Sequence, residues 1–418
     1  MLPKKLSSLA IAALATFLVH CSIASDTTVS PTSDEPAKTE PGASEKTTKS
    51  ADAPGSNANG EGKAAGPVED GAPVEAFPPT DPGEGTWLGP EEFDNAPECM
   101  DGTPTGLGLS RSPTGSKKVL IFMQGGGACF DGQTCAIADH ALSADHMDAE
   151  TFAEWKDSAG RATVMNRDRS ENPFRDWNHV FVPYCSGDVF SGANEKGFDG
   201  RPQLGFKNVS AYLPRLKATF HDAQQVVLGG TSAGGYGAAY NYVQVQKAFA
   251  GLDITVIDDS GPPLSSTFTP TCLQEKWAST WQMDKTSPVD GPFPLREGGG
   301  GLFQPVQDLI RAHPKLKFAF ISHEADLVMR YFHGIGFSFN CAAPGLLSGD
   351  FFADGLREVR SIQGDNFLTY YGPGRGHQYF KGDDADLYDT EAGGVNLATW
   401  LGQIVNGEDA PKRVPAEF

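Results

Sequence analysis

The chain has 418 residues, a formal net charge of −20 and 39% hydrophobic residues. This length allows one large hydrophobic core with extensions. The negative charge argues against a nucleic-acid partner, because a phosphate-binding protein needs a clustered basic surface and the sequence contains no such cluster.

Residues 1–24 are typical of a secretion signal. Lys4 and Lys5 precede an apolar stretch, residues 6–19, that is too short to span a bilayer as a stable helix. Two ends of the signal remain open: a small-residue cleavage site at residues 22–24, or a lipoprotein signal that leaves Cys21 acylated. Both predict export, either as a secreted protein or as a cell-surface or outer-membrane lipoprotein.

Residues 25–90 are rich in Pro, Ser, Thr, Gly, Ala and acidic residues and contain almost nothing that a core could bury. This composition predicts a flexible tether. The remaining residues, 91–418, are expected to form a single catalytic domain.

After Cys99 short apolar runs alternate with segments of helical period. The runs expected to form buried parallel strands are residues 119–124, 179–184, 225–229, 254–258, 318–322 and 367–371. The segments expected to form helices are residues 211–220, 233–249, 302–313 and 395–405. The order predicts a three-layer α/β domain with a mostly parallel central sheet. Three longer stretches, residues 131–176, 262–301 and 334–364, are expected to form lid or rim insertions around a pocket.

The segment from Gly230 to Gly234 has the pattern G-x-S-x-G, with Ser232 at its centre. It follows a predicted strand and precedes a predicted helix, the sharp turn on which a nucleophilic serine is presented. The small neighbours leave room for this turn, and the helix N-terminus stabilises developing negative charge. The alternative is a plain glycine-rich turn between strand and helix.

A serine nucleophile needs a histidine base and a carboxylate that orients it, and in this fold class both follow the serine, acid first. Among the later histidines, His377 is preferred because it lies in a glycine-rich loop that follows a strand. Asp326 is the preferred acid, since it follows the end of another predicted strand. Asp258 and Asp259 remain alternatives for the acid, or buried hydrogen-bonding residues beneath the serine turn.

An oxyanion hole is expected from the glycine loop at residues 125–127, which directly follows the first strong strand. Its backbone N–H groups, those of Gly126 and Gly127, would act together with the N–H of Ala233.

Six of the seven cysteines lie after residue 98, an even number that predicts disulfides in an exported protein. Spacing alone supports only a short loop between Cys129 and Cys135. Neither close CxxC pairs nor an HExxH segment is present, so no metal site is expected.

Together, several motifs in this order resemble the pectin acetylesterase and Notum family of carboxylesterases. The motifs lie at residues 125–129, 182–188, 230–235, 259–261 and 376–377, and the resemblance extends from about Cys99 to Leu401. It implies an α/β-hydrolase-like fold, a triad of Ser232, Asp326 and His377, and no cofactor.

The resemblance also supports the pairing of Cys129 with Cys135 and implies the pairs Cys99–Cys185 and Cys272–Cys341. One departure concerns the oxyanion loop, where Gly127 and Ala128 stand in positions at which Notum-like members carry bulky aromatic residues. The fatty-acyl activity of that branch is therefore not implied.

The leading hypothesis is an exported, monomeric serine carboxylesterase that removes acyl groups, acetyl above all, from a polysaccharide such as pectin or from a small ester. A second hypothesis keeps the triad but assigns a longer acyl ester, a polyester or a peptide as substrate. A third is a non-catalytic carbohydrate-binding protein, with Trp277 and Trp281 as an exposed platform. The spacing of these two tryptophans also fits burial of one helix face.

Overall fold

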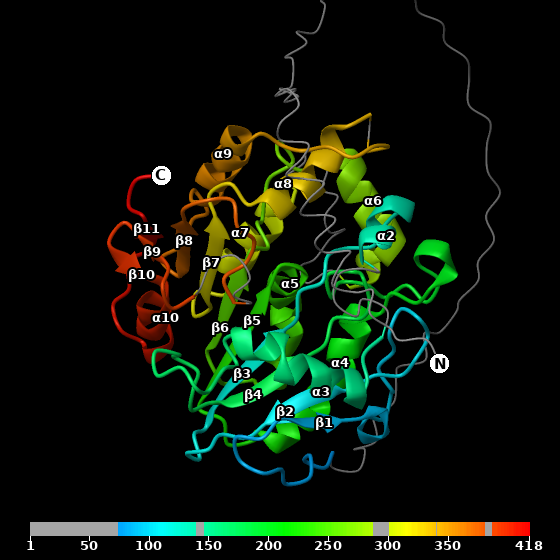
Figure 1. The fold of residues 1–418 in the computed structure, drawn as a ribbon, viewed down its shortest axis with the longest axis vertical. Coiled ribbons are helices and arrows are strands. Elements are labelled where there is room, and N and C mark those ends of the chain that lie inside the picture. The colour runs from blue at the N-terminus through cyan, green and yellow to red at the C-terminus, as the bar shows by residue number, and fades with distance from the viewer. Residues whose placement is uncertain (1–73, 139–145, 287–300, 340, 381–386) are drawn as a thin grey trace, which may run out of the picture. The chain divides into compact units, whose positions relative to one another are not determined.

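A computed structural model of the chain describes residues 74–138, 146–286, 301–339, 341–380 and 387–418. Within these residues nine strands form one sheet, in the order β1-β2-β4-β3-β5-β6-β7-β8-β11 (Figure 1). The strands are β1 (Thr86–Leu88), β2 (Leu107–Ser110), β3 (Lys118–Met123), β4 (Asn178–Val182), β5 (Gln225–Thr231), β6 (Ile254–Asp259), β7 (Lys317–His323), β8 (Phe367–Gly372) and β11 (Arg413–Val414). Strands β1 and β2 run antiparallel to their neighbours, and all pairs from β4 to β11 are parallel.

The six strands expected from the apolar runs are all present, with ends that agree to within two residues. Their runs are continuous because both faces of the sheet are covered. On β3, for example, Val119 and Ile121 pack into one core and Leu120 and Phe122 into the other. The predicted fold class, an α/β-hydrolase-like sandwich with a mostly parallel sheet, is confirmed.

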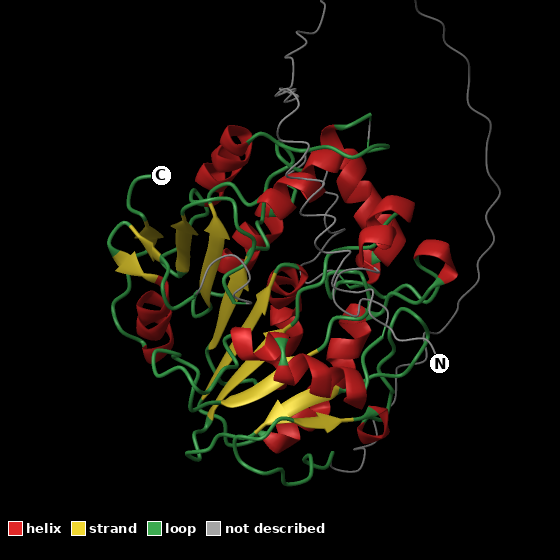
Figure 2. Cartoon of the chain, in the orientation of Figure 1, coloured by secondary structure: helices red, strands yellow, loops and turns green. Residues whose placement is uncertain are grey.

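Helices cover both faces of this sheet (Figure 2). Side chains of α4, α5, α7 and α9 contribute to the core on one face, and those of α3 and α10 to the core on the other. The helices are α2 (Gly132–Ala138), α3 (Ala149–Asp157), α4 (Gly205–Thr219), α5 (Ala233–Ala248), α6 (Thr271–Trp281), α7 (Phe303–Ala312), α8 (Leu327–Gly334), α9 (Gly349–Val359) and α10 (Leu397–Asn406). Helices α4, α5, α7 and α10 correspond to the predicted segments, and α4 begins six residues earlier than expected.

The predicted insertions contain helices of their own. Helices α2 and α3 lie in the first stretch, α6 in the second and α9 in the third. A separate two-stranded sheet, β9 (Glu391–Ala392) with β10 (Val395–Asn396), precedes α10.

The packed chain begins before residue 91, inside the stretch expected to be a tether. Strand β1 pairs with β2, and Phe77 is 3% exposed and packs edge-on against Phe93. The backbone N–H of Phe77 also donates to Oγ1 of Thr219 on α4. The secretion signal, Cys21 and residues 25–73 of the expected tether lie outside the described residues.

Disulfide bonds are present, as expected for an exported chain. They join Cys99 to Cys185, Cys129 to Cys135 and Cys272 to Cys341. The third bond ties helix α6 to the segment that follows α8, so it links two of the inserted stretches.

Candidate active site

Ser232 lies on the sharp turn between β5 and α5, at the carboxyl edge of the sheet. Its backbone has φ 57° and ψ −118°, a conformation that a non-glycine residue adopts only under strain. Its carbonyl oxygen accepts hydrogen bonds from the N–H groups of Gly235 and Tyr236, which fixes the start of α5. The turn therefore presents the serine side chain at the N-terminus of a helix, where a negative charge is stabilised.

The glycines around Ser232 are required by close packing. A Cβ on Gly234 would lie 2.0 Å from the carbonyl oxygen of Met123, at the end of β3. A Cβ on Gly125 would lie 2.6 Å from the carbonyl oxygen of Thr231 and 3.1 Å from Cβ of Ser232. The glycine loop after β3 is thus packed directly against the serine turn.

The structure brings His377 and Asp326 to Ser232. Nε2 of His377 lies 2.8 Å from Oγ of Ser232, and Nδ1 lies 2.8 Å from Oδ2 of Asp326. Asp326 follows β7 and His377 follows β8, so all three side chains come from loops at the carboxyl edge of the sheet. Asp326 is fully buried and the His377 side chain is 12% exposed.

The hydrogen bonds fix the tautomer of the imidazole. The carboxylate of Asp326 uses Oδ1 to accept the N–H of Met329, at the start of α8, and Oδ2 to accept Nδ1–H of His377. Nε2 of His377 then carries a lone pair that accepts the hydroxyl proton of Ser232. This is the arrangement by which a histidine removes a proton from a serine.

The two alternative acids have other partners. Oδ1 of Asp258 accepts the N–H of Gly261, and burial raises the pKa of Asp258 well above its usual value. Asp259 accepts hydrogen bonds from the backbone N–H groups of Tyr379 and Phe380. Both aspartates are buried hydrogen-bonding residues next to the serine turn, the second of the two roles expected for them.

The groups expected to form the oxyanion hole lie beside Ser232. Gly127 and Ala233 line the pocket into which Ser232 opens, and Gly126 is buried next to Gly127. The hydroxyl of Tyr184 donates to the carbonyl oxygen of Gly127 at 2.9 Å, which holds the loop in place. Gly127 has φ 79°, a conformation that favours glycine.

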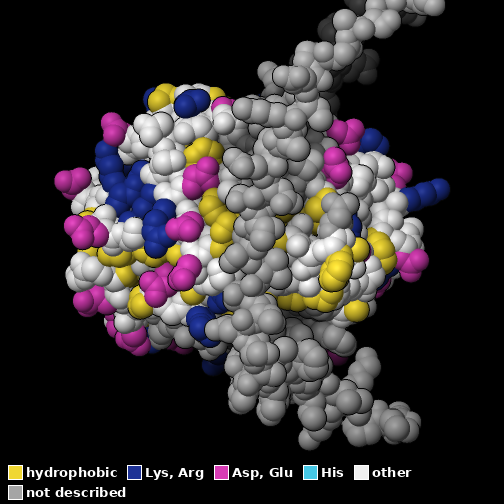
Figure 3. Space-filling model, turned by 90° about the horizontal axis from the view of Figure 1, so that it is seen from above, with side chains coloured by type: hydrophobic (Ala, Val, Ile, Leu, Met, Phe, Trp, Pro, Cys, Tyr) yellow, Lys and Arg dark blue, Asp and Glu magenta, His cyan; other side chains and the backbone are white. Residues whose placement is uncertain are grey.

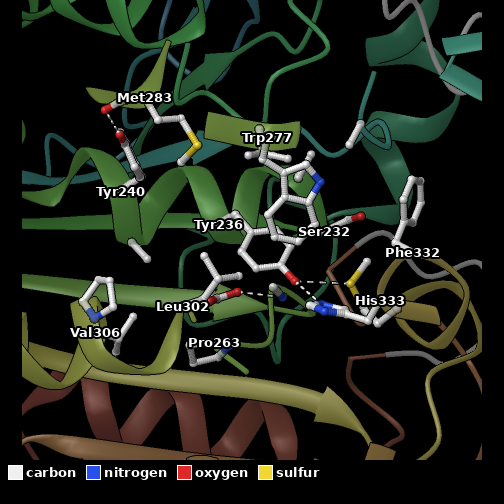
Figure 4. Close-up of a pocket in the computed structure, with 18 of the residues that line it drawn as sticks. Ser232, Tyr236, Tyr240, Pro263, Trp277, Met283, Leu302, Val306, Phe332 and His333 are labelled. Atoms are coloured by element: carbon white, nitrogen blue, oxygen red, sulfur yellow. Dashed lines mark hydrogen bonds between the residues drawn. The ribbon is translucent and has the colours of Figure 1, made fainter. Parts of the chain in front are cut away.

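A largely apolar pocket extends from Ser232 between α5, α6, α7 and α8 (Figure 4). Its walls are mainly aliphatic and aromatic. They include Trp277, Met283, Leu302, Val306 and Phe332. An apolar group attached to a carbonyl at Ser232 would contact these walls.

One side of the pocket carries a polar pair, Tyr236 and His333 (Figure 4). The hydroxyl of Tyr236 lies 3.0 Å from Nε2 of His333, and Nδ1 of His333 lies 2.9 Å from Oγ1 of Thr269. Burial lowers the pKa of His333 to about 3, so this imidazole is neutral at physiological pH. His333 therefore belongs to the pocket wall, and its two ring nitrogens are bonded to Tyr236 and Thr269.

The tryptophans proposed as an exposed platform are buried. Trp277 is 7% exposed and Trp281 is 1% exposed, and Nε1 of Trp281 donates to the carbonyl oxygen of Cys129. The spacing of the two tryptophans along the chain also fitted burial of one helix face, and this interpretation is correct for α6. The polar pair Tyr236 and His333 was not predicted, because its two members come from helices 97 positions apart in the sequence.

The pectinacetylesterase family matches residues 89–287. Similar proteins include palmitoleoyl-protein carboxylesterase notum2 of Xenopus laevis, 33% identical over 151 residues, which covers 35% of this chain and 30% of that protein. Palmitoleoyl-protein carboxylesterase notum1a of Danio rerio is 35% identical over 172 residues, with 39% and 32% covered. NOTUM of Homo sapiens is 31% identical over 172 residues, with the same shares.

The chain thus matches about a third of the length of these curated relatives. The family match includes the glycine loop and the serine turn, and it ends before Asp326 and His377. With the parallel sheet and the order of its motifs, these matches make the chain similar to the pectin acetylesterase and Notum carboxylesterases over the region that carries the glycine loop and the serine turn.

Proposed function

We propose that this protein is a serine carboxylesterase. The observation that carries the proposal is the hydrogen-bonded series from Ser232 through His377 to Asp326, with both distances at 2.8 Å. The similarity to the pectinacetylesterase family supports it, as do the similar proteins named as carboxylesterases.

The geometry supports a two-step mechanism. His377 accepts the proton of Ser232 through Nε2 as Oγ attacks the ester carbonyl carbon, and Asp326 stabilises the imidazolium that forms. The N–H groups of Gly127 and Ala233, with that of Gly126, are proposed to receive the negative oxygen. His377 then gives its proton to the leaving alcohol oxygen. Water, activated by the same imidazole, releases the acid from the acyl-serine.

The apolar pocket supports an acyl group larger than acetyl. A methyl group would contact little of its wall, whereas each further buried methylene contributes about 0.8 kcal/mol. Gly127 and Ala128 line the pocket and add little bulk to it. The name of the similar proteins, palmitoleoyl-protein carboxylesterase, points in the same direction. Acetyl removal from a polysaccharide such as pectin is the second candidate, and it is favoured by the name of the matching family.

Replacement of Ser232 by alanine tests the proposal. The purified variant is expected to lose about 10⁵-fold or more in kcat on p-nitrophenyl esters and to resist labelling by a fluorophosphonate, since no hydroxyl remains to be acylated. Ser210→Ala, a change on the exposed side of α4, is the control. Wild-type protein that neither hydrolyses any ester nor reacts with the probe would instead favour a non-catalytic binding protein.

We propose that the protein is exported. Residues 1–24 resemble a secretion signal, and disulfides form and persist in oxidising compartments. Of the helices in the described part of the chain, none has the length and apolar character needed to cross a membrane. A lipid on Cys21 would anchor the protein, and the mass of the mature N-terminus would distinguish this from cleavage after residue 24.

A further inference from the structure

Asp259 is a fully buried carboxyl group outside the proposed triad. Its Oδ2 accepts the N–H of Tyr379 at 2.8 Å, the N–H of Phe380 at 2.7 Å and the hydroxyl of Thr231 at 2.9 Å. Its Oδ1 accepts the hydroxyl of Ser260 at 3.0 Å. A buried carboxylate is tolerated when donors of this number satisfy its oxygens.

The donors belong to the two segments that carry the proposed nucleophile and base. Thr231 directly precedes Ser232, while Tyr379 and Phe380 follow His377 within the same loop. The backbone adds a further bond, from the N–H of Ser232 to the carbonyl oxygen of Asp259 at 2.7 Å. Asp259 thus connects the serine turn, the end of β6 and the histidine loop.

Gln378 closes this network. Its backbone N–H donates to Oγ of Ser260 at 3.1 Å, and its Oε1 lies 2.7 Å from the hydroxyl of Thr231. The single hydroxyl proton of Thr231 is thus shared between Oδ2 of Asp259 and Oε1 of Gln378, which brings the residue next to His377 into polar contact with the residue next to Ser232. We call Thr231, Asp259, Ser260 and Gln378 the clamp.

Three non-glycine residues in these segments have left-handed backbone conformations. The φ angles are 57° at Ser232, 66° at Ser260 and 64° at Gln378. Such conformations are costly and persist only where surrounding contacts hold them. The hydrogen bonds of the clamp start at these residues or at their immediate neighbours, so they supply those contacts.

We propose that Asp259 is a positioning residue of the esterase, one that holds the His377 loop in register with the Ser232 turn. This inference rests on the proposed function. The hydrogen bonds of the carboxylate go to Thr231, Ser260 and the backbone of residues 379 and 380, and Asp259 is not among the residues that line the acyl pocket. It therefore acts on the rate of acylation through geometry, because a displacement of about 1 Å between reacting groups costs about 10²-fold in rate.

Asp259→Asn is the main variant, because asparagine keeps the size of the side chain and one acceptor oxygen. It places an amide N–H₂ among groups that are themselves donors, which loosens the clamp. We expect kcat to fall about 10- to 100-fold while KM changes less than about threefold, since the pocket is intact. Thr231→Val, which removes only the hydroxyl bond between the two segments, is expected to produce a smaller loss of the same kind.

Asp188→Asn is the matched control. Asp188 is also fully buried, and it accepts bonds from the hydroxyl of Ser186 and from the N–H groups of Phe190, Gly192 and Gly205. None of these donors is adjacent to Ser232 or His377 in sequence. Its replacement is expected to lower Tm as Asp259→Asn does, with a much smaller effect on the acylation rate constant.

Timed labelling of Ser232 by a fluorophosphonate separates positioning from folding, because the adduct does not turn over. The proposal expects Asp259→Asn to reach full labelling amplitude with a slow rate constant, because every molecule is folded and reacts slowly. A reduced amplitude with a wild-type rate constant would overturn it, since Asp259 would then only maintain the fold. If Asp259→Asn does not fold, Thr231→Val decides by the same two quantities. Wild-type protein without ester hydrolysis or labelling would reject the proposed function, and the positioning role with it.

Discussion

The side chain of Asp326 has two partners, and together they fix its orientation. One oxygen accepts Nδ1–H of His377, and the other accepts the N–H of Met329, as the N-cap of α8. The helix start therefore holds the carboxylate, and the carboxylate holds the imidazole. Because aspartate is also a good N-cap residue, the proposed catalytic role and the capping role are compatible in one side chain.

Asp326→Asn separates these two roles. Asparagine caps a helix about as well as aspartate, so Tm should change little. Its amide offers the imidazole a donor as readily as an acceptor and cannot stabilise the imidazolium, so kcat should fall about 10³- to 10⁴-fold. Asp326→Ala should show the same loss of kcat and, in addition, a loss of about 1 kcal/mol in the free energy of unfolding from the missing cap. Equal stability of the two variants would contradict the capping role, and a modest change in kcat would contradict the triad.

Helices α5 to α8 form the walls of the pocket. The side chains on these helices therefore set the length of the acyl group that the pocket can hold. Val306 lies on α7 and Leu302 directly before it, and both line the cavity. A bulky side chain at Val306 would shorten the space without contact to the triad.

Val306→Trp is expected to alter acyl-chain selectivity. Hydrolysis of p-nitrophenyl esters from acetyl to hexadecanoyl should show a wild-type optimum beyond acetyl, because longer chains bury more apolar surface. In the variant, kcat/KM on the longest chains should fall at least about tenfold, which corresponds to the burial of two or three methylenes. The acetyl ester is the internal control and should keep its rate. A wild-type optimum at acetyl would favour the second candidate, deacetylation.

The long parallel strands were predictable from sequence, whereas several shorter elements were not. Strands β3, β5, β6, β7 and β8 are continuous apolar runs bounded by turn residues, and buried parallel strands need that pattern. Strands β1 and β11 have three and two residues, too few for any period to be detected. Helices α6 and α9 lie in insertions that contain many glycines and prolines, and only the spacing of Trp277 and Trp281 indicated the first of them.

The positions of Ser232, Asp326 and His377 followed from the same reasoning, because the ends of parallel strands meet at one edge of the sheet. The pocket did not follow from it. Trp277, Tyr236 and His333 face one another only after α5, α6 and α8 have packed, and no local pattern encodes that contact. Asp259 was expected as a buried hydrogen-bonding residue, but the partners that make it part of the clamp lie about 120 residues further along the chain.

Over the whole molecule, the net charge of −20 implies solubility rather than a specific partner. Acidic and basic side chains are both present on the face shown in Figure 3. The ionisable groups with the strongest influence on stability are instead buried. Burial lowers the pKa of both His179 and His333 to about 3, and it raises the pKa of Asp188, Asp258 and Asp259. As the pH falls, the buried histidines lower the free energy of unfolding and the buried carboxyl groups raise it. The effect of one group therefore has to be isolated by substitution.

His333→Gln isolates one buried histidine. The unfolded chain binds a proton at His333 below about pH 6.5, whereas the folded protein keeps it neutral down to about pH 3. The unfolded state therefore binds more protons in this window, and wild-type stability falls as the pH falls through it. Glutamine can bond to Thr269 and Tyr236 but does not titrate. The stability advantage of the wild type over the variant should be largest above about pH 6.5 and should shrink by roughly 2–3 kcal/mol by about pH 4.5.

Urea unfolding of the two proteins across this range measures the difference directly, and the contributions of His179 and the carboxyl groups cancel because both proteins contain them. His221→Gln, which replaces an exposed histidine, controls for the loss of a histidine as such and should leave the wild-type slope nearly unchanged. Parallel curves for wild type and His333→Gln would mean that His333 is protonated in the folded protein. The polar side of the pocket would then carry a positive charge at acidic pH, and that charge would oppose the binding of an apolar acyl chain beside it.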